Sequence, residues 1–195
     1  MFNGFGWNGV GSSFHDHEAQ LTFRPISAMT IGSGVRINRQ ENYEQWTGLV
    51  TDTTDHYVFG HLSQTTVALT ERFNYTMSPN LSLQLYAEPF VSGGSYDLFK
   101  ELIDGRNPDY LRRYAPFAYD MDANGNPDFN VKSFRTTNVL RWEYKPGSTL
   151  FVVWQQAREN DAVPGDFRFG RDVHAIFGVP PKNVFLVKLA YWLNY

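Results

Sequence analysis

The sequence predicts an all-β fold, an antiparallel segment of a transmembrane β-barrel with about seven or eight long strands. Three observations predict it. Apolar and polar residues alternate with a period of two in many stretches, which is the pattern of strands. Short turns alternate with longer connections, and the last strand carries a row of apolar residues. Helical periodicity is nearly absent, and its best candidate is the short segment 96–103.

The composition excludes several other classes of protein. The 195 residues include 17 basic and 20 acidic side chains and no cysteine. The near-neutral charge gives no electrostatic argument for a nucleic-acid partner, and the missing thiols exclude disulfides and cysteine-based zinc or redox sites. No stretch approaches the roughly 18 apolar residues of a spanning helix. Barrel strands, by contrast, are polar on one face, which fits a mean hydropathy of −0.40 beside 16% aromatic residues.

Turn residues set the bounds of the expected strands. Tight turns with Pro or Gly alternate strictly with longer connections, of which residues 94–130 and 160–182 are the longest. Splitting the expected strand 28–51 at its polar patch, residues 39–42, would break this alternation, so we keep it as one strand. Short periplasmic turns and long extracellular loops are typical of outer-membrane barrels. The expected strands are 13–24, 28–51, 55–77, 80–93, 131–145, 148–159 and 183–195.

We expect residues 1–195 to be one barrel domain that is the C-terminal part of a larger barrel. Single-chain bacterial barrels have even strand numbers, and seven is odd. An eighth strand within residues 1–12 would instead give a small closed barrel. Residues 1–13 lack the basic start, apolar core and cleavage site of an export signal. The chain is therefore expected to be either cytosolic or a mature or truncated piece.

The last strand is the strongest single signal. Its apolar face packs on the core in a soluble sandwich. In a barrel of the Gram-negative outer membrane it faces lipid, and the strand serves as the signal for the barrel-assembly machinery. The asymmetry of the connections and the aromatic surplus favour the barrel. The residues expected to face lipid are Phe185, Val187, Leu189, Tyr191, Leu193 and Tyr195.

The opposite strand faces would then line the lumen. They are polar, mildly basic and paired in sign, as a water-filled or plugged interior requires. Glu71 is an exception, because it falls on the apolar face beside Leu69 and Phe73, where a charge is tolerated only near an interface or a protein neighbour. The residues expected to line the lumen are Arg36, Arg72, Gln84, Glu88, Arg135, Arg141, Glu143 and Lys188, with Asn38, Asn74 and Tyr86.

Three segments carry a resemblance to a known family. Residues 73–96, 137–158 and 183–195 resemble the C-terminal barrel of the bacterial family called domain of unknown function 5916, and RWEYKPGSTLF is a fairly specific part of this likeness. The resemblance implies full-length members several times longer, with a signal peptide, a module similar to family-nine carbohydrate-binding domains and a large outer-membrane barrel. It implies no catalytic residues. A carbohydrate partner is implied only through that module, so the expected role here is transport or structure.

Residues 120–128 form a candidate calcium loop. Oxygen ligands at positions 1, 3 and 5, a glycine at 6 and a carboxylate at 9 can wrap around a hard cation. Position 12 is Val131 and helical flanks are missing, so this is not an EF-hand, and the dissociation constant would be about 10⁻⁴–10⁻³ M. A hydrophilic loop rich in turn formers explains the same residues. The candidate ligands are Asp120, Asp122, Asn124, Asn126 (through its carbonyl) and Asp128.

No other arrangement supplies convincing chemistry or indicates an organic cofactor. His15 and His17 share a strand face, but no third distant zinc ligand is evident, so a polar strand end is the expected role. G-x-S-x-G and H-E-x-x-H are absent. Besides the outer-membrane barrel, two hypotheses stay open. A soluble β-sandwich or lipocalin-like ligand-binding barrel would bury the aromatic rows that a membrane barrel exposes in two girdles. A barrel-embedded hydrolase would rely on His56 or His61.

Overall fold

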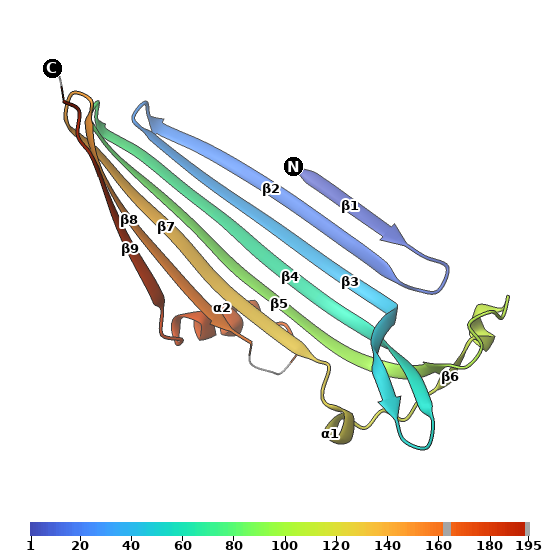
Figure 1. Ribbon diagram of the computed structural model, residues 1–195. Helices are drawn as coiled ribbons and strands as arrows, with labels where there is room; N and C mark the ends of the chain where they lie inside the picture. The colour runs from blue at the N-terminus through green and yellow to red at the C-terminus, as the bar shows by residue number, and fades with distance from the viewer. Residues whose placement is uncertain (162–164, 194–195) are drawn as a thin grey trace.

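The computed structural model describes residues 1–161 and 165–193 as one antiparallel sheet of nine strands with three short helices (Figure 1). The strands are β1 (Phe2–Trp7), β2 (Ser13–Ile26), β3 (Met29–Thr51), β4 (Asp55–Ser78), β5 (Leu81–Leu102), β6 (Tyr114–Pro116), β7 (Phe129–Lys145), β8 (Ser148–Asn160) and β9 (Lys182–Ala190). The helices are η1 (Tyr110–Arg112), α1 (Met121–Asn124) and α2 (Phe169–Phe177). None of these helices has the length and apolar character to cross a membrane.

Each long strand pairs with its neighbour in the sequence. The order across the sheet is β1-β2-β3-β4-β5-β7-β8-β9, and the short β6 pairs with the far part of β5. The tight turns and the end of β9 lie together at one end, which we call the tight-turn end, and the longer connections lie at the opposite loop end (Figure 1). The sheet is open within the described residues, with β1 and β9 at its two edges.

The seven expected strands are all present, and the eighth strand considered for residues 1–12 is β1. The helical candidate 96–103 is wrong, because β5 continues as a strand to Leu102. The reason is tertiary: this part of β5 pairs with the extended end of β4, with Val58 opposite Glu101 and His61 opposite Asp97. The first long connection therefore starts at residue 103 instead of 94, and it contains η1, β6 and α1.

The last strand is shorter than expected, since it ends at Ala190. Ala190 pairs with Thr149, and β8 begins only one residue earlier, at Ser148, so no further partner remains on that strand. The backbone N–H of Trp192 bonds instead to the Ser148 hydroxyl at 2.9 Å. Tyr195 lies outside the described residues.

Fully buried apolar side chains are few. They gather toward the loop end, where β4 and β5 carry Val58, Leu62, Val67 and Val91, and where Ile176 of α2 is buried as well. The segment 165–181, which contains α2, lies against β5, β7 and β8. Over the remaining length of the sheet, no other part of residues 1–161 and 165–193 forms a second layer on either face (Figure 1).

We expect Gly165→Ala to displace the segment 165–181 from the sheet. A Cβ added at Gly165 would lie 2.3 Å from the backbone oxygen of Gly94 and 2.9 Å from the Cβ of Asp128. Overpacking of this kind costs about 1–3 kcal/mol. Limited proteolysis should therefore cut this segment faster than in the unmodified protein. Gly170→Ala is the matched control, because a Cβ there meets nothing within 4 Å. Equal protection of the two variants would contradict this account.

Candidate functional site

The cross-strand register sorts the strand residues into two faces. Directly paired residues point to the same side of a sheet. Arg72 pairs with Tyr86, Glu88 with Arg135, and Arg141 with Phe151, so these residues share one side, which we call the charged face. All eight residues that the sequence predicts for the lumen belong to it: Arg36, Arg72, Gln84, Glu88, Arg135, Arg141, Glu143 and Lys188.

The arginines of the charged face are held by partners on the same face. Arg36 makes a two-pronged contact with Asp16, with Nε 3.0 Å from Oδ1 and Nη2 2.5 Å from Oδ2. The guanidinium of Arg72 lies 5.4 Å from the centre of the Tyr86 ring, whose hydroxyl donates to Glu88 at 3.2 Å. Two further ion pairs, Arg141 with Glu143 and Arg135 with Glu159, span 3.1 and 2.9 Å.

These contacts leave a polar surface without a strong field of one sign. A trough of about 350 Å³ lies along the charged face, lined by Glu18, Gln20, Arg36, Thr70, Arg72 and Glu88 among others. Paired charges of this kind favour water and polar solutes.

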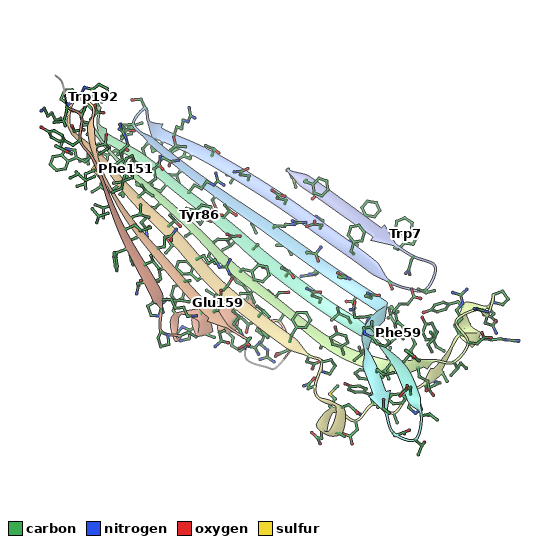
Figure 2. The ribbon with its side chains drawn as sticks, viewed as in Figure 1. Trp7, Phe59, Tyr86, Phe151, Glu159 and Trp192 are labelled. Atoms are coloured by element: carbon green, nitrogen blue, oxygen red, sulfur yellow. The ribbon has the colours of Figure 1, made fainter. Side chains whose placement is uncertain are left out.

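The opposite side, the apolar face, is uncovered over most of its length. Figure 2 shows side chains standing off the sheet from end to end, with Trp192 at the tight-turn end and Phe59 at the loop end. Phe185, Val187 and Leu189 of β9 lie on the apolar face and are 65–69% exposed. Trp154 of the neighbouring β8, on the same face, is less exposed, at 39%. The large apolar residues exposed there on the other strands include Phe5, Trp7, Leu21, Phe23, Ile31, Ile37, Leu85, Trp142 and Trp154.

β9 also differs from the expectation for a one-sided strand. Val184 and Leu186, which point to the charged face, are 50% and 56% exposed, so both sides of β9 are bare. The reason is its position at the edge of the sheet. Tyr191 and Leu193, also expected to face lipid, are exposed but follow the end of the strand.

The apolar face has a clear border toward the loop end. Going along each strand from the tight turns, its apolar residues give way to polar ones, for example after Ile37 on β3, where Arg39 follows on the same face. We call the part between the tight turns and this border the apolar band. Its one charge, Glu71, accepts a hydrogen bond from the Ser33 hydroxyl at 2.8 Å. Aromatic residues lie toward both limits of the band: Phe23, Phe73, Tyr75, Trp142 and Tyr144 near the tight turns, and Phe134, Trp154 and Phe185 toward the border.

His61 lies in an acidic cluster beyond the border. Its Nδ1 is 2.6 Å from Asp97 and its Nε2 is 2.9 Å from Glu41, while Tyr43 stacks on its ring at 4.1 Å. Ser63 donates its hydroxyl hydrogen to Glu41, at 3.0 Å. Both imidazole nitrogens therefore face carboxylates and none faces a hydroxyl, so this cluster ties β3, β4 and β5 together.

His56 forms a second bridge nearer the loop tip. Its Nδ1 contacts the Glu101 carboxylate of β5, and its Nε2 lies 3.3 Å from Asp52 and 3.2 Å from the Thr54 hydroxyl. Linear spacing gives no signal for either cluster, because the partners on β5 are 36 and 45 residues away in the chain. The hydrolase hypothesis that names these histidines stays a prediction.

The candidate metal ligands are used in local hydrogen bonds. The Asp120 carboxylate caps α1 by accepting from the N–H groups of Asp122 and Ala123, and the Asp128 carboxylate accepts from the N–H of Tyr96 at 2.7 Å. Asn126 accepts from the Asp128 N–H through its side chain. In residues 1–161 and 165–193, no three His, Asp or Glu side chains are grouped to hold a metal ion. Calcium binding by this loop stays a prediction. Of the two histidines considered as zinc ligands, His17 contacts the Asn3 side chain at 2.8 Å.

A small apolar pocket at the loop end was missed by the sequence. It measures about 310 Å³ and lies between the end of β5 and the η1–β6 segment. Lys100 donates to the Tyr110 hydroxyl at 2.8 Å and lies 4.3 Å from the centre of the Tyr114 ring. Burial lowers the pKa of Lys100, and burial with nearby Glu44 raises the pKa of Tyr110 to about 12. These residues come together because β5 continues to Leu102, into the part of the chain that the sequence predicts to belong to the connection 94–130.

We expect the His56 bridge at the loop end to stabilise residues 52–58 more in acid than in alkali. The hydrogen bond to Glu101 raises the pKa of His56 above its ordinary 6.5, whereas backbone N–H donors hold that of Asp52 at about 2. A raised histidine pKa gives stability that is complete below about pH 6.5 and is lost as pH rises through the raised value. Amide hydrogen exchange of residues 52–58, corrected for intrinsic rates, should therefore become faster as the pH rises through the raised pKa of His56. His56→Asn should abolish the dependence, and its persistence in this variant would refute the assignment.

The sequence of the chain matches a known family over nearly its whole length. The family described as Domain of unknown function (DUF5916) matches residues 11–195, which confirms the family that the three segments indicate. Neither a curated protein nor a solved structure matches the chain. With its open antiparallel sheet, charged face and bare apolar face, the chain belongs to the family Domain of unknown function (DUF5916).

Proposed function

We propose that this chain forms part of the wall of a β-barrel in the outer membrane of a Gram-negative bacterium, with a role in transport or in structure. The apolar face would contact lipid and the charged face would line the interior. The observation that carries the proposal is the uncovered apolar band. A monomeric soluble protein rarely exposes a contiguous apolar patch larger than a few hundred Å².

The dimensions of the strands support this proposal. A barrel strand tilted by about 45° needs about 9–11 residues to cross the hydrocarbon core. On β5 the part of the apolar face that is not buried extends from Leu81 to Pro89, which is close to that length. β3, β4 and β5 have 23, 24 and 22 residues, so they would continue beyond the bilayer at the loop end. The histidine clusters and the Lys100 pocket would then lie outside the cell, and the tight turns in the periplasm.

The two edges of the sheet require further pairing in this environment. In lipid each unpaired backbone N–H or C=O group costs several kcal/mol, so spanning sheets are closed. We propose that β1 and β9 are joined by further strands of a larger barrel, and that β9 is the strand engaged by the barrel-assembly machinery. The module similar to family-nine carbohydrate-binding domains, and any link to carbohydrate, stay part of this proposal, and no described residue carries them.

The main alternative, a soluble sandwich or lipocalin-like barrel, needs a second layer over the apolar band. Trp142, Trp154 and Phe185 are 39–69% exposed, whereas that alternative would bury them. Their exposure favours lipid as the covering phase.

The first test is the mobility of the protein on a gel. A barrel extracted in detergent keeps its hydrogen-bonded sheet until it is boiled. We therefore expect the protein to migrate faster before boiling than after it on a semi-native gel. A protein that is monomeric and soluble without detergent, with one mobility in both samples, would disprove the membrane location.

The second test is a charge placed on either face of β5. We expect Leu85→Arg to lower the free energy of unfolding in vesicles by about 2–4 kcal/mol, because it brings a cation to the lipid side. Gln84→Arg is the matched control, because Gln84 is next to Leu85 in the sequence but its side chain points to the charged face. This substitution should change the free energy of unfolding little. Urea titration followed by tryptophan fluorescence measures both. If Leu85→Arg proved as harmless as Gln84→Arg, the assignment of the faces would be wrong.

A further inference from the structure

The segment 165–181 folds back over the apolar face instead of extending away from the sheet. Phe177 at the end of α2 lies 5.4 Å, ring centre to ring centre, from Phe134, which belongs to the apolar face of β7. On the next strand, Arg158 of the same face contacts the backbone after α2. α2 is therefore seated at the border of the apolar band, where apolar strand residues give way to polar ones.

The start of α2 is fixed to the sheet by a polar network that includes the buried side chains of Asn130 and Asp172. The side-chain amide of Asn130 donates to the backbone oxygen of Asp166 at 3.1 Å. Arg171 bonds to the carboxylates of both Asp166 and Asp172 at 2.8 Å, and Asp172 accepts from the N–H of Arg168. Asp172 is fully buried.

The end of α2 is held by a single guanidinium. Nη1 of Arg158 donates to the backbone oxygens of Phe177 and Val179 at 2.9 and 2.8 Å. A cation at this position satisfies carbonyls that the helix leaves unpaired and matches the negative end of its dipole. Arg158 also lies 5.6 Å from the centre of the Phe177 ring. Both ends of the helix are thus fixed.

The outward side of α2 combines aromatic and basic residues. Asp172 and Ile176 are buried against the sheet, whereas Phe169 and Phe177 are 41% and 54% exposed. Arg171 and His174 lie between these two rings and are also exposed. Helices that lie in the plane of a membrane interface carry aromatic residues on one face and basic residues on the other, and the exposed residues of α2 include both kinds. The Phe177 ring continues the row of aromatic residues that includes Phe134.

We propose that α2 lies in the lipid headgroup layer, with the rings of Phe169 and Phe177 at the boundary between headgroups and acyl chains. This inference rests on the proposed membrane location and adds a partner for the loop. Where α2 is seated, the apolar face carries polar side chains, including the buried Lys132 and the half-buried Arg158, which acyl chains would not solvate. α2 covers them and presents aromatic rings in their place. It thereby supplies, from a loop, part of the aromatic girdle that barrel strands usually provide.

A direct test is possible because these 195 residues contain no cysteine, so a single introduced cysteine is the one site in them for a thiol-reactive label. Phe177→Cys is labelled with an environment-sensitive fluorophore in the protein reconstituted into phosphatidylcholine–phosphatidylglycerol vesicles. Nitroxide lipids then quench it from the headgroup or from deep in the acyl chain. Leu85→Cys reports the middle of the apolar band. Leu111→Cys, at a position 82% exposed at the loop end, is the aqueous control.

We expect the label at residue 177 to be quenched at least twofold more by the headgroup nitroxide than by the deep one. The label at residue 85 should show the reverse order, and the label at residue 111 should be quenched by neither. Phe169→Cys gives a second reading from the same helix, in case the first substitution loosens it. If residue 85 is quenched while 177 and 169 both behave like 111, this inference is overturned and the proposed function stands. If residue 85 is not quenched either, the proposed membrane location fails as well.

Discussion

The constraint on which the structure depends is the pairing of long strands in sequence order within one sheet. Each long strand pairs with the next long strand along the chain, and these pairs are antiparallel. This pairing satisfies the backbone along strands of up to 24 residues but provides no second layer. The alternation of side chains then sends one set to each side, and the described residues leave most of the apolar band uncovered.

The two faces and the loop end follow from this arrangement. On the charged face, contacts such as Arg36 with Asp16 make a polar surface stable without a hydrophobic core. At the loop end, where the strands pass the border of the band, the chemistry changes to histidines and carboxylates that join three strands. α2 marks the transition between these regions, since its buried side meets polar strand residues and its exposed side is aromatic.

Much of the fold could be predicted because period-two alternation is a local property of the chain. Seven strands and the set of residues on the charged face follow from it. The continuation of β5 to Leu102 could not be predicted, because residues 96–103 read as helical until β4 supplies a partner. The clusters of His56 and His61, and the pocket of Lys100, depend on that same pairing between distant residues. The seat of α2 depends on the close approach of Gly165 to the backbone of Gly94, which no short motif announces.

The central claim is that the apolar face of the sheet contacts lipid, and accessibility along one strand tests it most directly. Single cysteines at residues 83–88 of β5, in the protein reconstituted into vesicles, would be reacted with a water-soluble maleimide. If the apolar face contacts lipid, the reaction rate should alternate from one residue to the next. Cysteines at positions 84, 86 and 88 should react because they face a polar lumen, and cysteines at positions 83, 85 and 87 should be protected by lipid. Equal and rapid reaction of the odd-numbered positions would contradict it.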